Sequence, residues 1–183
     1  MNIVKKIVKN QKNKIYHQLL PETGKIEFFL TIENSFNGLV CFFCSSNENL
    51  DPSMHLSLES SDAGWHILLG RHNPETESWM HLKSNVVLKK QEKYHVEVIY
   101  GNCKNQIEIN GKKDGVFIES ENMNFPHNKN ELLSFGDLNN IVEKSPIKLE
   151  NFDIKERYNG KNSSIFHVQK PKVLDIEECR IFI

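Results

Sequence analysis

The sequence predicts an all-β protein, an antiparallel β-sandwich of the jelly-roll type, and three observations support this. Apolar and polar residues alternate along many short segments, which is typical of strands that have one buried face. These segments recur at roughly 10-residue spacing, as they do in sandwiches and barrels. No segment has the pattern of a helix of ordinary length. The alternation is clearest in the segment 93–112.

This segment predicts a β-hairpin around which the other strands can be arranged. Both arms alternate, and a turn at 101–105 separates them. Because successive side chains of a strand point to opposite faces, one face should be buried and the other should meet solvent. The residues expected on the buried face are Val96, Val98, Ile107 and Ile109, and those expected on the solvent face include Glu97 and Glu108.

Further strands follow from the same alternation. A second hairpin is expected where the turn Asp62-Ala63-Gly64 separates two alternating segments, and a polar loop is expected at 70–77. The alternation breaks once between Leu149 and Phe152, which predicts a β-bulge. The strands expected outside the first hairpin are 26–31, 39–44, 54–59, 65–69, 79–85, 132–135 and 147–154.

At 183 residues the chain is long enough for one substantial domain with extensions. We expect a basic lead-in at 1–24, the β-sandwich at 25–157, and a C-terminal extension at 158–183 that could form an edge strand. The lead-in has apolar residues spaced as on one side of a helix between lysines. It could touch a membrane surface or an acidic partner, or it could be a frayed lead-in or a first strand packed on the sheet.

Composition excludes several classes of function. The net charge is -1 with 26% charged residues, so no nucleic-acid partner is expected. The longest apolar run, Leu39–Cys44, is far below the roughly 20 residues of a transmembrane helix. The first 14 residues lack the pattern of a secretory signal. We therefore expect no transmembrane segment, and either an intracellular chain or a fragment of a larger protein; the sequence leaves localisation and oligomeric state unknown.

Four cysteines are present, and we interpret them as free thiols. Cys41 and Cys44 have the spacing of a CxxC motif, but they lie in an expected strand, where side chains three apart should point to opposite faces. Buried free thiols are common in core strands. Cys103 and Cys179 could pair, although nothing in the sequence supports that pairing.

Several segments together resemble the laminin-G-like branch of the concanavalin-A-like lectin and glucanase fold. The resemblance covers residues 25–156 and implies a concanavalin-A-like jelly roll. Tyr94-His95 stands where the family has Trp-His, and Asn110-Gly111 stands where it has Asp-Gly. The segments that carry the resemblance are Phe28–Val40, His55–Ser60, Tyr94–Val98, Ile107–Gly111, Leu133–Gly136 and Leu149–Ile154.

Galectins share this fold and are the second resemblance. They carry a sugar site of His, Asn-Pro, Trp and Glu. This chain has His72, Asn73, Pro74 and Trp79, but the spacing differs and the following Arg is missing. The galectin site is therefore not carried over to these residues.

The sequence predicts no enzyme. Hydrolases of this fold use two carboxylates two apart on one strand and a further acid, and no Glu-x-Asp-x-x-Glu occurs here. No cofactor is expected. A calcium site at the rim, which the laminin-G resemblance implies, would use Asp51 or Asp62. Four histidines expected on one outward face could bind a metal or sense pH, or could be ordinary surface residues: His55, His66, His81 and His95.

That outward face also carries Trp79, and such a mixture suits carbohydrate because an aromatic plane can stack on a sugar while polar side chains bind its hydroxyls. We therefore expect a non-catalytic, lectin-like binding module for a glycan. A protein-interaction or structural domain is the alternative, and a glycoside hydrolase is the weakest of the three. The expected ligand-binding residues are Trp79, His66, His81 and Asn85 at the centre, with His72 and Asn73 at the rim.

Overall fold

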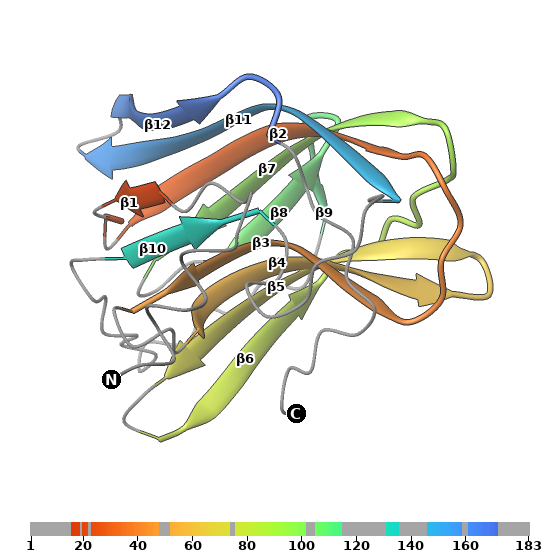
Figure 1. Ribbon diagram of the computed structural model, residues 1–183, viewed down its shortest axis with the longest axis horizontal. Helices are drawn as coiled ribbons and strands as arrows, with labels where there is room; N and C mark the ends of the chain where they lie inside the picture. The colour runs from red at the N-terminus through yellow and green to blue at the C-terminus, as the bar shows by residue number, and fades with distance from the viewer. Residues whose placement is uncertain are drawn as a thin grey trace, which may run out of the picture.

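The computed structural model is a sandwich of two antiparallel β-sheets of six strands each, which confirms the predicted all-β fold (Figure 1). It describes residues 16–18, 20–21, 23–47, 52–73, 76–101, 105–114, 131–135, 146–158 and 161–171. Within these ranges every regular element is a strand. The described part of the chain contains no helix with the length and hydropathy of a membrane span.

Sheet A has the strand order β1-β10-β3-β4-β5-β6. Its strands are β1 (Tyr16–Gln18), β10 (Glu131–Ser134), β3 (Leu39–Ser46), β4 (Pro52–Ser61), β5 (Gly64–Asn73) and β6 (Ser78–Lys83). Sheet B has the order β12-β11-β2-β7-β8-β9. Its strands are β12 (Lys161–Val168), β11 (Ile147–Tyr158), β2 (Gly24–Ile32), β7 (Lys93–Tyr100), β8 (Gln106–Ile109) and β9 (Lys112–Asp114).

The predicted hairpin of 93–112 is confirmed as β7 and β8. Val96 lies opposite Ile109 and Val98 lies opposite Ile107, and all four side chains are buried. Glu97 faces Glu108 on the other side of the sheet, where both are half-exposed. The next turn, into β9, has positive φ at Asn110 and Gly111, as a two-residue type I′ turn requires.

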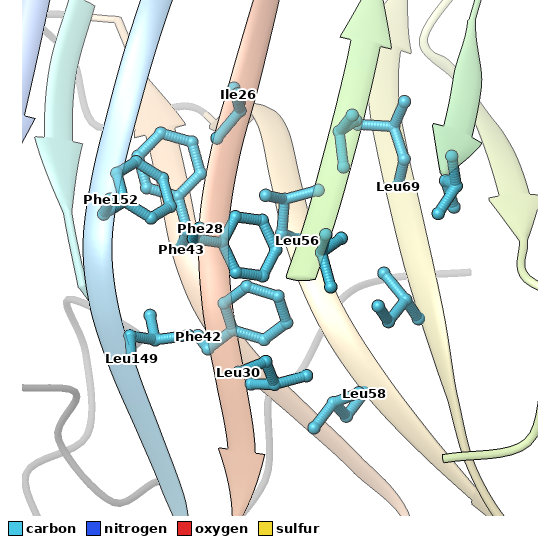
Figure 2. Close-up of a cluster of buried hydrophobic side chains, with 14 of the residues drawn as sticks. Ile26, Phe28, Leu30, Phe42, Phe43, Leu56, Leu58, Leu69, Leu149 and Phe152 are labelled. Carbon is cyan, nitrogen blue, oxygen red and sulfur yellow. The ribbon is translucent and has the colours of Figure 1, made fainter. Parts of the chain in front are cut away.

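Aromatic rings fill the space between the two sheets (Figure 2). Phe28 of β2 stacks on Phe152 of β11 with ring centroids 5.5 Å apart, and it meets Phe42 of β3 at the same distance. Phe43 lies 4.9 Å from Phe152. All four rings have 0% exposure. Because they come from both sheets, their burial holds the two layers together.

Two bulges adjust which side chains face this core. The predicted bulge in β11 is confirmed: pairing with β2 shifts between Glu150 and Asp153, Asn151 has a positive φ, and Leu149 and Phe152 both stay buried. The second bulge is in β3, and the alternation of apolar and polar residues does not predict it.

In β3 the pairing with β4 shifts between Cys41 and Phe43, so that Phe42 and Phe43 both point inward. Cys41 then lies opposite Ser57, and Cys44 lies opposite His55, on the outer face. The expectation that the two cysteines point to opposite faces is therefore wrong, because the bulge adds one residue between them. Neither cysteine forms a disulfide; Cys41 is buried and Cys44 is half-exposed.

The segments that precede and follow 25–157 in the sequence each contribute one edge strand, β1 to sheet A and β12 to sheet B. β1 pairs with β10 in sheet A, and β12 pairs with β11 in sheet B. Tyr16 of β1 lies 5.0 Å from Phe166 of β12, edge to face, and Phe166 also stacks on Phe135. Aromatic contacts thus link the two sheets along this side. Residues 1–15, 19 and 22 of the basic lead-in, together with Cys103 and Cys179, lie outside the described residues.

Candidate functional site

The outer face of sheet A presents Trp79 and His81 on the edge strand β6. Met80 and Leu82 are 6% and 1% exposed and point to the core, so the alternation of β6 turns Trp79, His81 and Lys83 outward. This is the orientation that the sequence predicts. Trp79 is half-buried, whereas His81 is exposed.

Three imidazoles surround the Trp79 ring. His72, its direct partner across β5 and β6, lies 5.1 Å from it, and His55 lies at the same distance. His81 is nearly parallel to the indole, with centroids 6.0 Å apart and planes 15° apart. These four residues, Trp79, His55, His72 and His81, are called the His–Trp cluster below. The cluster joins three adjacent strands, β4, β5 and β6.

His55 forms the floor of the cluster. It is 2% exposed, and its Nδ1 lies 2.8 Å from Ser57 Oγ. Its ring lies across Gly70 so closely that a β-carbon on that residue would be 1.9 Å from His55 Nε2. Burial, together with the nearby His81, lowers the pKa of His55 to about 3. At neutral pH the His55 ring is therefore uncharged.

His81, on β6, lies on the same outer face of sheet A as His55 and is exposed to solvent. It pairs with Gly70 in register, and its ring centroid lies 5.6 Å from that of His55. Partial burial lowers the pKa of His81, while the carboxylate of Glu59 acts in the opposite direction. Glu59 itself forms an ion pair with Lys83. The His55 ring at the base of the cluster is thus uncharged at neutral pH, and the ion pair of Glu59 and Lys83 lies near His81.

The other three predicted site residues lie away from Trp79. The expected loop at 70–77 is wrong in its first part, because β5 continues to Asn73. Asn73 pairs with Ser78 and is on the side of β5 opposite to His72. His66 lies at the other end of β5, where its Nδ1 donates to the Ser84 carbonyl at 2.9 Å. Asn85 follows Ser84 and is exposed.

The expectation that His95 shares this face is wrong, because His95 is on β7 and belongs to sheet B. Strand alternation gave the correct orientation, but the assignment of strands to sheets depends on long-range pairing. On the outer face of sheet B, His95 Nε2 lies 2.9 Å from Glu27, and Lys25 and Lys155 each approach a carboxylate at 2.5 Å. That face is a network of ion pairs.

This network lowers the pKa of Glu27. Burial by itself raises it, but hydrogen bonds from Lys155 and His95 and the charge of Lys25 outweigh burial and bring the pKa to about 2. Ligand atoms of Glu27, His95 and Glu97 lie within 4.8 Å of one another, as in a metal site. The two lysines already neutralise these carboxylates.

Of the residues considered for calcium, Asp51 lies outside the described ranges, and Asp62 is exposed in the β4–β5 turn.

Sequence reasoning missed a buried polar group between the sheets. Arg71, on β5, is 2% exposed and donates to the Gly101 carbonyl at 2.8 Å, while its guanidinium lies 5.9 Å from the centre of the Tyr100 ring. Glu131, on β10, is 1% exposed; burial raises its pKa, and Ser53 and Ser45 donate to it. The signal was present for Arg71, because it continues the inward series of Ile67 and Leu69.

No protein-family model and no curated protein matches this chain. Among solved structures, the chain is similar to the full-length tailspike protein 2 of an Escherichia coli O157:H7 bacteriophage, with a TM-score of 0.54 and 15% identity. That match covers 78% of this chain and 21% of the tailspike chain. It shows the β-sandwich fold and no more, since the chain spans only about a fifth of the tailspike's length.

Two lectin-type structures are more distant. A human galectin-16 variant matches with a TM-score of 0.49 and 12% identity, over 79% of this chain and 95% of the galectin. The carbohydrate-binding module CBM40 of the Ruminococcus gnavus sialidase, bound to α2,3-sialyllactose, matches with a TM-score of 0.49 and 17% identity, over 64% of each chain. These scores are too low to assign a family or an activity.

Proposed function

We propose that this chain is a non-catalytic, lectin-like module that binds a glycan on the outer face of sheet A. The observation that carries the proposal is the His–Trp cluster: a half-buried indole on an edge strand, held among three imidazoles. An indole plane can pack against the apolar face of a pyranose ring. Imidazoles beside it can donate and accept hydrogen bonds with the hydroxyl groups.

The chemistry of the two outer faces favours sheet A over sheet B. On sheet B the carboxylates of Glu27 and Glu97 are already bound by Lys25, Lys155 and His95. A neutral sugar would have to displace these ion pairs in order to bind there. On sheet A the His55 ring is uncharged and none of the four cluster residues is in an ion pair, so a sugar could bind to the cluster without breaking one.

The absence of catalysis is part of the proposal. A glycosidase needs one carboxyl group that stays protonated near neutral pH as the acid. Glu27 and Glu97 lie directly opposite each other across β2 and β7, with carboxylate oxygens within 4.8 Å of each other. The pKa of Glu27 is lowered to about 2, so it is unsuited to act as that acid.

A protein partner is the second candidate, because β6 has an open edge that could pair with a strand from another chain. An apolar docking surface has less support. Among the described residues Val86 is the one large hydrophobic side chain with substantial exposure, at 40%. Stable protein interfaces usually contain an apolar centre, and a single exposed valine does not provide one.

A glycan array, run with calcium and with a chelator, tests the proposal. The wild-type protein should bind at least one glycan class, and Trp79→Ala should lose that signal. Trp65→Phe is the matched control, because Trp65 packs on Phe36 and donates to the Phe36 carbonyl, away from the cluster. Binding that survives Trp79→Ala would place the ligand elsewhere. A folded protein that binds no glycan but captures a strand-forming peptide would support the second candidate.

A further inference from the structure

His55 Nε2 is a buried polar atom that has no hydrogen-bond partner. The ring cannot turn freely to find one, because it is packed over Gly70 and its Nδ1 is held by Ser57 Oγ at 2.8 Å. A buried polar group without a partner is costly, and its presence in a folded protein calls for an explanation. When Nδ1 carries the proton and donates it to Ser57, Nε2 presents a bare lone pair.

The His55 ring is a close neighbour of the His81 ring. His55, Gly70 and His81 form one row across β4, β5 and β6. Gly70, between them in this row, has no side chain, and the ring centroids of His55 and His81 are 5.6 Å apart. No hydrogen bond holds His81 among the described residues, and its ring is exposed to solvent. The space between them is therefore bordered by two imidazoles and the Gly70 backbone.

We propose that His55 Nε2 and the His81 ring bind a divalent transition-metal ion of the Cu²⁺, Ni²⁺ and Zn²⁺ group. Two imidazoles that share one ion, with metal–nitrogen bonds of about 2.0–2.1 Å, have ring centres roughly 5–6 Å apart. The observed 5.6 Å matches this separation. Water would complete the coordination on the solvent side, where His81 is exposed.

The surroundings of His55 resemble those of a metal ligand. A ligating histidine usually gives its second ring N–H to a neighbouring acceptor, which fixes the tautomer and the ring orientation. Ser57 Oγ is such an acceptor, and Ser57 is itself fully buried. Imidazole nitrogens favour Cu²⁺, Ni²⁺ and Zn²⁺ over Ca²⁺ and Mg²⁺, which prefer oxygen. This site does not depend on the proposed glycan function.

Glu27, His95 and Glu97 on sheet B form a second group that could be considered for a metal ion, but it is less suited to bind one. Its possible ligand atoms lie within 4.8 Å of one another, but Lys25 and Lys155 already occupy the carboxylate oxygens. His95 Nε2 is hydrogen-bonded to Glu27 as well. Both Glu27 oxygens, Glu97 Oε2 and His95 Nε2 already have partners there, whereas His55 Nε2 has none.

Trp79 supplies a direct readout, because its ring lies 5.1 Å from His55 and 6.0 Å from His81. In a Trp65→Phe background it is the only tryptophan, since the chain has two. Titration with Cu²⁺ in a weakly coordinating buffer should quench its fluorescence saturably, with one ion per chain. Zn²⁺ should compete with Cu²⁺, and Zn²⁺ alone should raise Tm, because an ion that binds only the folded state stabilises it.

Three variants distinguish this site from other surface histidines. His81→Gln should weaken Cu²⁺ binding at least about tenfold, and Ser57→Ala should weaken it by roughly 10-fold to 100-fold through loss of ring orientation. His72→Gln should leave the affinity unchanged, although His72 is as close to Trp79 as His55 is. Because His81 is exposed, its replacement should not unfold the protein. Quenching that is non-saturable, unchanged in His81→Gln, or lost equally in His72→Gln would overturn the proposal.

Discussion

The His55 ring is packed against Gly70 on the neighbouring strand, and a β-carbon on Gly70 would be 1.9 Å from His55 Nε2 and 2.4 Å from its Cδ2. Glycine at this position is therefore a packing requirement of the outer face of sheet A. With a β-carbon there, the imidazole could not keep its present position beside Trp79 and His81. The arrangement of the His–Trp cluster therefore depends on Gly70 of β5.

Gly70→Ala should displace the His55 ring and disturb the cluster. Inserting a methyl group into a packed site typically costs about 1–3 kcal/mol of unfolding free energy. We expect a loss in this range by chemical denaturation, together with a changed Trp79 emission spectrum. The double variant His55→Ala/Gly70→Ala is the control, because removing the ring opens the space. If Gly70→Ala costs as much in the His55→Ala background as in wild type, the contact is not the cause.

Val98→Asp should unfold the domain. Val98 is fully buried on β7 opposite Ile107, so the aspartate would be an unpaired buried charge that costs several kcal/mol, roughly 3–5 or more. Circular dichroism and thermal melting would show the loss. Ile99→Asp is the matched control, since Ile99 is adjacent but half-exposed on the outer face. Comparable melting of wild type and Val98→Asp would contradict the assignment of the buried face.

The sequence was sufficient for local structure because a strand's alternation is a local property. Val96 and Glu97 could be assigned to opposite faces from the pattern alone, and the bulge beside Asn151 could be located because both Leu149 and Phe152 are apolar. The strand β5 was predicted too short because Arg71 and His72 are polar. Arg71 is buried only because the Gly101 carbonyl and Asn105 meet it from sheet B.

Sheet membership could not be obtained in the same way. His55 and His95 both lie on outward faces, yet on different sheets, because pairing of β2 with β7 and of β5 with β6 is decided by contacts between distant segments. The bulge at Phe42 was hidden for a related reason. Phe42 and Phe43 are both apolar, so only the register with β4 shows that Cys41 and Cys44 share a face. The cluster around Trp79 depends on these two kinds of long-range information.

Glu27→Gln should lower stability at neutral pH and have little effect in acid. The folded-state pKa of Glu27, about 2, is below its ordinary value of 4.5, so the ionised form stabilises the fold. That contribution is fully present above pH 4.5 and is lost as the pH falls towards 2. Because the side chain is 25% exposed, solvent screening limits the effect, and we expect about 1 kcal/mol at pH 7.

Urea denaturation of wild type and Glu27→Gln at pH 7 and pH 3 measures this difference. The gap between the two proteins should shrink at the lower pH. Glu33→Gln is the control, since Glu33 is exposed at the end of β2 and outside the ion-pair network. A gap of the same size at both pH values would show that the loss comes from packing and not from the charge of Glu27.

Incubation with laminarin, xylan or a similar polymer should release no reducing ends. The reason is that Glu27, which lies opposite Glu97, is unsuited to act as the acid because its pKa is lowered, whereas Glu131, whose pKa is raised, is only 1% exposed. Reducing-end assays over long incubations provide the measurement. Activity that disappears in Glu27→Gln or Glu97→Gln would overturn the non-catalytic proposal, and activity that neither variant changes would point to a contaminating enzyme.

Trp79→Ala should weaken glycan binding about fivefold to tenfold. An aromatic contact of this kind contributes roughly 1 kcal/mol or more, which corresponds to that change in affinity. The half-buried position of Trp79 on an edge strand means that its removal should leave the core intact, because Met80 and Leu82 keep their inward positions. Calorimetric titration with a glycan identified on the array would give the affinities of wild type, Trp79→Ala and Trp65→Phe. Equal affinity of folded Trp79→Ala and wild type would remove the His–Trp cluster as the binding site and leave the rest of the outer face, around His66 and Asn85, to be tested.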